Sequence, residues 1–366
     1  MRVLIVTGDM RVGGAEKTAL ELIRALEGGG QWFTVAALRG EGPLGEEFIR
    51  AGARLHENVA PRRFQPQAPL RLRRIIRDGG IEAVIVLDPL RNGLFHALAA
   101  SSLSFPRPAR ICWCHAWPGG QAGNFAPALR AYLRAGLLDV VVCVSRAQRR
   151  RLVEAGLPRR RLPVIPNGID LERFVAPKPS HLPLPSGKRI IVQVANAMPD
   201  KDFPTLLAAG GALARRRSDF HLLLVGRGTD SPDMVRAVAE AGLKDVATLA
   251  GPRDDVAGIL ARADVFVLSS ARETFGLAVL EAMAAAAPVV ATDLPALAEL
   301  ISQGEDGLLV PPADPAALAG AMELMLDDKP LAHRLRQAAR RRAAAFSSAR
   351  MAGRFERLLR LLIRRN

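Results

Sequence analysis

The chain has 366 residues, more than a single hydrophobic core normally spans, so two domains are expected. Hydrophobic residues make up 49% and charged residues 24%, a composition that excludes disordered, collagen-like and coiled-coil proteins. No run of about 18 apolar residues predicts a membrane-spanning helix, and the first residues do not resemble a signal peptide. We therefore expect a cytoplasmic protein whose three cysteines, Cys112, Cys114 and Cys143, are free thiols.

Positive charge is unevenly distributed along the chain. The net charge of +15 combines +12 over residues 1–180, −7 over residues 181–330 and +10 over residues 331–366. Such a surface attracts phosphate groups on nucleic acid, on an anionic lipid leaflet or on a phosphorylated acceptor. Aromatic residues are only 5%, and no basic stretch is interleaved with rings that stack bases, so no nucleic acid partner is expected. The alternative is an Arg-rich solvated surface without a partner.

The first half of the chain alternates strand-like and helical patterns. It opens with an apolar run at 2–7, continues through Gly8 and the pair Gly13-Gly14, and then shows helical periodicity over 15–26. Further strand-like runs follow at 34–38, 83–87, 111–114, 140–144 and 164–165, with helical patterns at 69–78 and 93–100. This alternation predicts a parallel sheet with helices on both faces.

A stretch with four prolines at 175–185 predicts an extended connector between two domains. A second series of strand-like runs follows at 190–194, 222–225, 247–249, 265–268, 289–291 and 308–310. We therefore expect an α/β protein with two doubly wound parallel sheets facing an interdomain cleft. Residues 1–175 would form the first domain and residues 176–346 the second. Ligands of such sheets bind at the carboxyl ends of the strands.

Two glutamates lie in the segment that follows the strand-like run at 265–268. Glu273 is in the loop after the strand, and Glu281 is about two turns into the next helix, which begins with the amides of residues 275–277. A helix N-terminus suits a phosphate, and two carboxylates suit the hydroxyls of a ribose and a sugar, so the segment suits a nucleotide sugar. The alternative is that Glu281 caps or pairs on an exposed helix face.

The two glutamates form a Glu-x7-Glu pattern that resembles the signature of the retaining glycosyltransferases of family 4, which have the GT-B fold. Other landmarks of that family occur in the same order along the chain. They are Gly13-Gly14-Ala15-Glu16, Val144-Ser145, the segments 164–170, 251–256 and 288–293, Glu299, the segment 307–312 and Asp314. The resemblance covers essentially the whole chain. It implies a GT-B fold of two Rossmann-like domains and a nucleotide-sugar donor.

The resemblance also implies roles for the residues of the acidic segment. Glu281 is expected to bind the nucleotide ribose, and Glu273 is expected to contact the transferred sugar. The amides of residues 275–277 are expected to approach the sugar and the distal phosphate. The remaining donor-binding residues of this segment are Thr274, Phe275, Gly276 and Leu277.

The family places an arginine and a lysine on the first loop of the second domain, where they stabilise the charge that develops on the leaving diphosphate. Lys201 matches the lysine. The arginine is missing, because Asn196 and Met198 occupy the positions where it commonly stands. Arg227, after the next strand, is either a replacement for it or a surface arginine. Arg253, in a later family landmark, is also expected in the donor site.

His115 follows the strand-like run at 111–114, where the family commonly has a histidine that contacts the donor sugar. A structural role is the alternative. Together with Lys201 and Glu273 it forms the expected catalytic set. The pair Gly13-Gly14 lets the backbone approach a ligand and presents helix amides to an anion. In the family context it contributes to the donor phosphate and acceptor region.

No metal or other cofactor is expected. Cys112, Cys114 and His115 superficially suggest zinc, but alternate strand positions face opposite sides and no second ligand pair occurs. The Asp-Lys-Asp sequence at 200–202 resembles a cation-binding motif. In this family context its lysine is expected to bind the diphosphate instead, which predicts metal independence.

The last residues predict an amphipathic helix of about 347–366 that packs back on the first domain. Its apolar face would consist of Met351, Phe355, Leu358, Leu359 and Leu362. The other face is basic, so the +10 of the tail would join the +12 of the first half. We therefore expect peripheral attachment to the anionic inner face of the cytoplasmic membrane, where the acceptor would be recognised.

The resemblance thus implies a metal-independent retaining hexosyltransferase. The donor would be a nucleotide sugar, with a UDP-sugar favoured and GDP-mannose as the second choice. The acceptor would be a hydroxyl of a membrane-associated glycolipid or polysaccharide, in lipopolysaccharide or polysaccharide biosynthesis. The leaving phosphate would deprotonate that hydroxyl on the same face of the sugar, without an enzyme nucleophile. The alternatives are a nucleotide-sugar epimerase or hydrolase of the same fold and a catalytically weak nucleotide-binding subunit.

Overall fold

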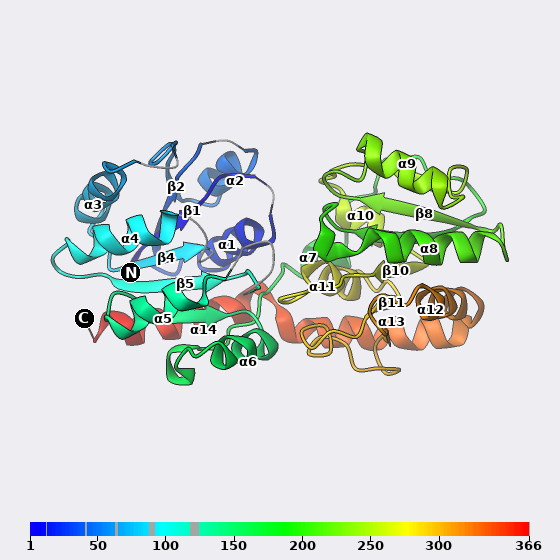
Figure 1. The fold of residues 1–366 in the computed structure, drawn as a ribbon. Helices are drawn as coiled ribbons and strands as arrows, with labels where there is room; N and C mark the ends of the chain where they lie inside the picture. Colours follow the sequence, from blue (N-terminus) through cyan, green and yellow to red (C-terminus); the bar gives the residue numbers. More distant parts are fainter. Residues whose placement is uncertain (12, 41, 63–64, 88–91, 118–123, 366) are drawn as a thin grey trace. The chain divides into compact units, whose positions relative to one another are not determined.

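The computed structural model describes the chain except residues 12, 41, 63–64, 88–91, 118–123 and 366 (Figure 1). By its internal contacts the chain divides into unit 1, Met1–Ile169 with Ser347–Asn366, and unit 2, Asp170–Phe346. The division lies before residue 170 rather than after residue 175. The reason is that the short helix α7 (Glu172–Val175) contacts two helices of unit 2, α10 (Val256–Leu260) and α11 (Leu277–Ala284).

Unit 1 is built on a six-stranded parallel sheet with the strand order β3-β2-β1-β4-β5-β6. Its strands are β1 (Arg2–Thr7), β2 (Trp32–Ala37), β3 (Arg54–His56), β4 (Ala83–Leu87), β5 (Ala109–Cys114) and β6 (Val140–Cys143). Its helices are α1 (Gly14–Ala25), α2 (Leu44–Arg50), α3 (Ala68–Asp78), α4 (Asn92–Ser102), α5 (Ala126–Arg134), α6 (Arg146–Glu154) and α14 (Ser348–Ile363). The winding direction reverses between β1 and β4, which creates a topological switch point.

Helices cover both faces of this sheet because its strands are apolar on both sides (Figure 1). Leu4 of β1 belongs to the core that also contains residues of α3, α4 and α5. Trp113 of β5 packs on the other face of the sheet. Its ring lies 4.3 Å from that of Phe355 of α14, centroid to centroid, with the two rings tilted. α14 also contacts α1. Because successive side chains of a strand point to opposite faces, the sheet has one hydrophobic core on each face.

Unit 2 repeats the same winding, with the strand order β12-β11-β10-β7-β8-β9. Its strands are β7 (Arg189–Val194), β8 (Phe220–Val225), β9 (Ala247–Leu249), β10 (Val265–Leu268), β11 (Val289–Thr292) and β12 (Leu308–Val310). Its further helices are α8 (Phe203–Ala214), α9 (Pro232–Glu240), α12 (Pro315–Asp327) and α13 (Lys329–Ala343), with the short helices η2 (Pro199–Lys201) and η3 (Ala344–Phe346). The expectation of two doubly wound parallel sheets is confirmed.

One local expectation in unit 1 is wrong, and one strand of the sheet was not predicted. The run at 164–165 does not form a strand, since Val164 makes only an isolated bridge with Cys143. The edge strand β3 was not predicted, because its sequence Arg54-Leu55-His56 has a single apolar residue. An edge strand needs fewer apolar residues than a central one, so the hydrophobic pattern does not reveal it.

The tail helix α14 packs its apolar face inside unit 1. Met351, Phe355, Leu359 and Leu362 are buried, and Leu358 is half-buried. α13, by contrast, belongs to unit 2, so only about half of the positive tail joins unit 1. Unit 1 then carries 31 Lys and Arg against 14 Asp and Glu, a net charge of +17, whereas unit 2 carries 20 against 22, a net charge of −2.

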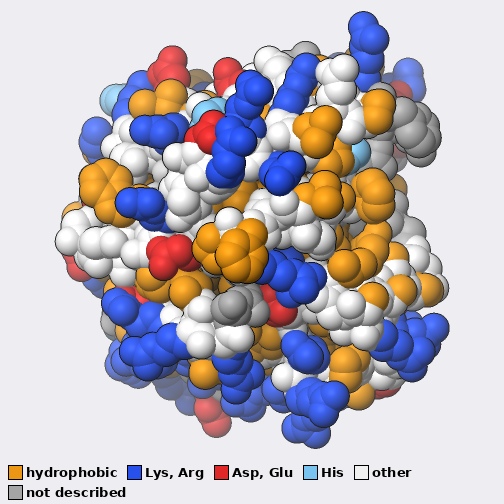
Figure 2. All heavy atoms as spheres, turned by 90° about the vertical axis from the view of Figure 1, so that its left-hand side faces the viewer, with side chains coloured by type: hydrophobic (Ala, Val, Ile, Leu, Met, Phe, Trp, Pro, Cys, Tyr) orange, Lys and Arg blue, Asp and Glu red, His pale blue; other side chains and the backbone are white. Residues whose placement is uncertain are grey.

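Lys and Arg side chains gather in patches on the face of the molecule in Figure 2, with hydrophobic side chains between them. Among the described residues, no helix combines the length and the apolar character needed to cross a bilayer.

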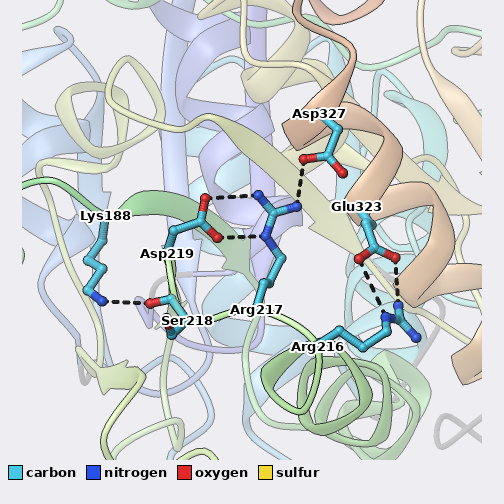
Figure 3. A network of polar contacts seen from close by, with 7 residues as sticks. All are labelled: Lys188, Arg216, Arg217, Ser218, Asp219, Glu323 and Asp327. Atoms are coloured by element: carbon cyan, nitrogen blue, oxygen red, sulfur yellow. Dashed lines mark hydrogen bonds and ion pairs between the residues drawn. The ribbon is translucent and has the colours of Figure 1, made fainter.

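A polar network in unit 2 joins the end of α8 to α12 (Figure 3). Arg217 binds Asp219 through two hydrogen bonds of 2.7 and 2.9 Å and binds Asp327 at 2.8 Å. This arginine holds the pKa of Asp219 at about 2, well below its usual value. Arg216 binds Glu323 at 2.9 Å from a more exposed position. The network fixes the helix that leads into β8 against the neighbouring α12.

Candidate functional site

The candidate site of unit 2 lies at the carboxyl ends of β7 and β10. These two strands are neighbours in the sheet, and the winding reverses between them. The loop after β7 contains Lys201, and the loop after β10 contains Glu273. Loops that leave a switch point in opposite directions open a crevice, which is where ligands of doubly wound sheets bind.

Lys201 and Glu273 form an ion pair across this switch point. The Lys201 ammonium donates to Oε1 of Glu273, and the hydroxyl of Ser270 donates to the same oxygen at 3.0 Å. The Glu273 side chain is only 9% exposed, whereas the Lys201 side chain is 25% exposed. The carboxylate is therefore held in one orientation, and the ammonium retains contact with solvent.

Hydrogen bonds fasten the two loops to each other. The amide of Ala271 donates to the carbonyl of Asp200 at 2.9 Å, and the Arg272 guanidinium lies 3.3 Å from the Asp200 carboxylate. The Ser269 hydroxyl lies 3.0 Å from the carbonyl oxygens of Lys201 and Asp202. Since backbone groups of both loops are tied directly, the Lys201–Glu273 geometry is set by the fold as well as by the ion pair.

Gly276 caps the start of α11, and its backbone is left-handed with φ +96°. Only glycine adopts this conformation without strain, and a Cβ here would lie 2.5 Å from a methyl carbon of Leu297. Phe275 is buried and its ring lies edge-on to Phe346 of η3. The start of α11 is therefore rigidly placed beside Glu273, with Thr274 and Leu277 on either side of the turn.

Glu281 is the fifth residue of α11, just over one turn into the helix and so closer to its start than expected. It is half-buried and has no side-chain partner among the residues that the structure describes. A carboxylate in this condition can accept two hydrogen bonds from a ligand. Ala286, two residues after the end of the helix, adopts the left-handed conformation with φ +54° although it is not glycine.

The three remaining donor-site candidates of unit 2 differ in their surroundings. The Asn196 side chain accepts a hydrogen bond from the amide of Arg227 at 3.0 Å, so both residues lie at the carboxyl ends of the adjacent strands β7 and β8. The Arg227 side chain is exposed. Arg253 forms a two-pronged ion pair with Asp255, at 2.9 and 2.8 Å, and Ser180 donates to the same carboxylate. Arg253 is thus engaged in a structural pair, unlike Arg227.

In unit 1, Gly13 precedes α1 and Gly14 is its first residue. The carboxylate of Glu16 folds back over Gly13, where a Cβ would collide with it, and accepts a hydrogen bond from the Thr7 hydroxyl at 3.1 Å. Burial raises the pKa of Glu16 above its usual value. A carboxylate of the protein itself therefore lies at the start of α1, where the sequence predicted that a ligand anion would bind.

His115 follows β5 in unit 1, and both of its ring nitrogens are buried. Its ring lies 4.9 Å from that of Trp113. Burial lowers the pKa of His115 to about 4, although its contacts with the Trp113 backbone and the Asn167 side chain act in the opposite direction. The imidazole is therefore neutral at pH 7 and packed into the unit.

The cysteines and the Asp-Lys-Asp motif contain the side chains that most resemble metal ligands. Cys112, Cys114 and Cys143 form no disulfide bond and are buried, and burial raises the pKa of the Cys143 thiol to about 12. Asp200 pairs with Arg272, and the Asp202 carboxylate accepts from the amide and hydroxyl of Thr205 at the start of α8. Within the described part of the chain, no group of three or more metal-binding side chains comes together.

Sequence reasoning missed the groups that support the site. These groups are the side chains of Ser269, Ser270 and Gln193, for which the sequence predicts no role. The Gln193 side chain is fully buried and accepts from the Ser269 amide at 3.2 Å. A polar residue inside the otherwise apolar run at 190–194 was the available signal, since buried polar groups need specific partners.

Two protein-family models match the chain, one over most of unit 1 and one over most of unit 2. Residues 12–173 match the model described as Glycosyltransferase Family 4. Residues 177–342 match the model described as Glycosyl transferases group 1. Together the two models span most of the chain.

Curated relatives include a glycogen synthase and several proteins named as glycosyltransferases. Glycogen synthase of Mycobacterium tuberculosis is 27% identical over 304 residues, which is 82% of this chain and 69% of that protein. D-inositol 3-phosphate glycosyltransferase of Kineococcus radiotolerans is 33% identical over 57% of this chain and 54% of that protein. The lipopolysaccharide core biosynthesis glycosyltransferase LpsE of Rhizobium meliloti is 30% identical over 54% of this chain and 56% of that protein. The last two alignments thus span about half the length of each relative.

Solved structures show the same fold over their whole length. A glycosyltransferase from Rickettsia africae superimposes with a TM-score of 0.83 at 19% identity, covering 100% of this chain and 99% of that one. Anabaena HepE, solved in complex with UDP and glucose, also gives 0.83 at 17% identity, covering 98% of this chain and 99% of that one. These likenesses establish the two-unit fold of the chain.

Proposed function

Because the chain belongs to the GT-B glycosyltransferases, whose family models match both of its halves, we propose that it is a retaining hexosyltransferase that works at an anionic membrane surface. As a group 1 glycosyltransferase it acts on nucleotide sugars. The donor is a UDP-hexose, with GDP-mannose as the second choice. The acceptor is a hydroxyl of a membrane-associated glycolipid or polysaccharide.

The observation that carries this proposal is the meeting of Lys201 and Glu273 at the switch point of unit 2, with Glu281 just over one turn into α11, the helix that follows Glu273. Glu281 accepts hydrogen bonds from two ribose hydroxyls, which its lack of a side-chain partner among the described residues favours. Glu273 accepts from a sugar hydroxyl. The HepE complexes with UDP, glucose and UDP-glucose support a uridine donor.

Lys201 stabilises the diphosphate as it leaves. The Lys201 side chain is a quarter exposed and so able to reach a ligand, while its carboxylate partner is held by Ser270. Arg227 supplies a second positive charge in place of the missing loop arginine, because its exposed side chain lies at the end of the adjacent strand. Arg253 does not contribute directly, since Asp255 occupies its guanidinium.

Transfer proceeds with retention and without an enzyme nucleophile, the leaving phosphate accepting the proton of the incoming hydroxyl. The firm engagement of Glu273 by Lys201 and Ser270 supports this, because a carboxylate so held is a poor nucleophile. Metal independence is supported by the engagement of Asp200 with Arg272 and of Asp202 with Thr205. In place of a metal cation, Lys201 and Arg227 neutralise the negative charge of the leaving diphosphate.

The acceptor side is unit 1, which carries a net charge of +17. Such a charge attracts the unit to anionic lipid headgroups at the inner face of the cytoplasmic membrane. Because the apolar face of α14 is buried, this helix does not insert into the membrane. The attachment of the protein to the membrane therefore depends on charge. The names of relatives such as LpsE support a lipopolysaccharide-type acceptor.

The function is tested by incubating the purified chain with radiolabelled UDP-glucose or GDP-mannose, with and without a membrane glycolipid extract. A labelled glycolipid that forms only with the extract, with the α-configuration of the donor sugar by NMR, supports the proposal. Free sugar at the same rate without acceptor would identify a hydrolase instead. Binding of one nucleotide without any turnover would favour a binding subunit.

Membrane attachment is tested by cosedimentation with phosphatidylcholine vesicles that contain or lack phosphatidylglycerol. Binding only to the anionic vesicles, with loss at high salt, is expected. Equal binding to both kinds of vesicle would contradict an electrostatic attachment.

A further inference from the structure

A groove of about 800 Å³ lies at the edge of unit 1, lined by residues of β3 and α3. β3 is the outermost strand of the sheet, so the groove lies beside a free sheet edge. Arg54 and His56 line it from β3, and Arg71 and Arg74 line it from α3. None of these residues belongs to the donor site of unit 2.

The geometry of the two elements explains why these side chains gather. Residues two apart on a strand point to the same side, which places Arg54 with His56. Residues three apart on a helix are neighbours on its surface, which places Arg71 with Arg74. Three arginines from two elements therefore line one groove.

The positive charge of the groove is only partly neutralised by the protein. Among the residues that the structure describes, none of the three arginines has a carboxylate partner. Arg71 reaches only the backbone oxygens of Asn58 and Val59, at 3.4 Å. Arg77, on the same helix, is instead paired with Asp78 at 2.8 Å.

Two carboxylates also line the groove, Glu57 and Asp78. Asp78 is taken by Arg77, so Glu57 offsets one of the three charges and an excess of positive charge remains. Like charges confined to one groove repel, and an anion that fits between them relieves this repulsion. His56 adds a neutral hydrogen-bonding ring, since burial and then the charge of Arg54 lower its pKa.

We propose that this groove binds the phosphoryl group of a larger molecule. Guanidinium groups recognise phosphate through paired charge-assisted hydrogen bonds, and three of them here converge from two elements. The groove has far more room than a phosphate ion needs, and polar Asn58 and Gln67 and exposed Leu70 supply contacts for the rest of the molecule. Under the function proposed above, this molecule is a phosphorylated acceptor, and that part of the inference rests on the proposed function.

The groove is tested with pyrophosphate as the probe, by calorimetric titration of the full chain at low salt. The groove variant is Arg71→Gln with Arg74→Gln, and the matched control is Arg62→Gln with Arg73→Gln, two residues that do not line the groove. Each pair removes two positive charges from exposed positions that have no carboxylate partner among the described residues, so their effects on the general field and on folding are comparable. Arg54→Gln on β3 serves as a separate test from the opposite wall.

The groove variant is expected to weaken pyrophosphate binding about tenfold or more, and the control about twofold or less. Arg54→Gln is expected to weaken it severalfold. Equal weakening by the groove variant and its control would show a diffuse electrostatic effect and overturn the proposal. Unchanged binding in the groove variant would overturn it as well.

Vesicles distinguish a lipid headgroup from a soluble phosphorylated molecule as the source of the phosphoryl group. Binding to phosphatidylcholine vesicles with phosphatidic acid that is lost only in the groove variant assigns the group to a lipid. Vesicle binding that both pairs reduce alike, with pyrophosphate binding still specific to the groove, assigns it to a soluble molecule. UDP binding by the groove variant is expected to match the wild type, so failure of the groove and failure of the donor site remain separate results.

Discussion

The Lys201 ammonium donates to the carboxylate of Glu273 from a loop 72 residues earlier in the chain, at the point where the winding of the second sheet reverses. The two residues come from neighbouring strands, and backbone hydrogen bonds between their loops keep them together. In the proposed reaction one of them contacts the sugar and the other the leaving diphosphate. The ion pair thus links the two ends of the bond that breaks.

This pair predicts non-additive effects on catalysis. Lys201→Met and Glu273→Gln are each expected to lower kcat/KM by about 10²- to 10³-fold, because each removes a charge that acts on the transition state. The double variant is expected to be little worse than the weaker single one, since the residues act as a unit. Lys188→Met is the control, because its ammonium binds Ser218 at the opposite end of β7. Independent, multiplying losses would argue against a coupled pair.

The turn at Gly276 predicts a stability cost on substitution. Gly276→Ala forces a left-handed backbone on alanine and places its Cβ against Leu297, so unit 2 is expected to lose about 2 kcal/mol or more. Gly320→Ala is the control, since Gly320 lies within α12 with open space around it and is expected to gain about 0.5–1 kcal/mol. Thermal unfolding measures both, and shifts of the same sign would contradict the strain at Gly276.

The buried imidazole of His115 predicts a pH-dependent stability. Its folded pKa of about 4 lies below the unfolded value of about 6.5, so the unfolded state binds the proton first as the pH falls. Its contribution is therefore complete above pH 6.5 and is lost between about pH 6.5 and 4, up to about 3 kcal/mol. Urea unfolding of wild type and His115→Gln should show a free-energy difference that shrinks over this range. A constant difference would mean that His115 titrates normally in the folded state.

The network of Figure 3 predicts unequal roles for two adjacent arginines. Arg217→Ala is expected to destabilise unit 2 by about 1–2 kcal/mol, because it removes a two-pronged bond to Asp219 and the bond to Asp327 from a side chain that is 17% exposed. Arg216→Ala is expected to cost about 0.5 kcal/mol or less, because its single partner is bound at a more exposed position. Denaturant unfolding compares the two, and equal losses would contradict this ranking.

The central strands could be predicted from the sequence because strands buried on both faces read as continuous apolar runs, as β4 and β10 do. β3 could not, since an edge strand with Arg54 and His56 lacks such a run. The roles of individual charges also escaped prediction. Arg253 reads in the sequence like Arg227, yet Asp255, two residues on, engages only Arg253.

Contacts between loops that are distant in the chain could not be predicted from the sequence either. Lys201 and Glu273 were each identified as site residues, but their pairing depends on strand order, which periodicity does not encode. The groove of unit 1 was missed entirely, because its arginines come from a polar edge strand and from one face of α3. In both cases the tertiary arrangement decides which side chains meet.

The most direct test of the central claim is the thermal unfolding of the purified chain with UDP, GDP, ADP and TDP, each with and without a chelator. One nucleotide, UDP by expectation, at about 100 times its dissociation constant should add about 2.7 kcal/mol, a shift of several degrees. The shift should survive the chelator, disappear in Glu281→Ala and persist in Glu240→Ala, a control at the exposed end of α9. A shift that Glu281→Ala leaves intact, or no shift with any nucleotide, would contradict a donor site built on α11 and the switch point of unit 2.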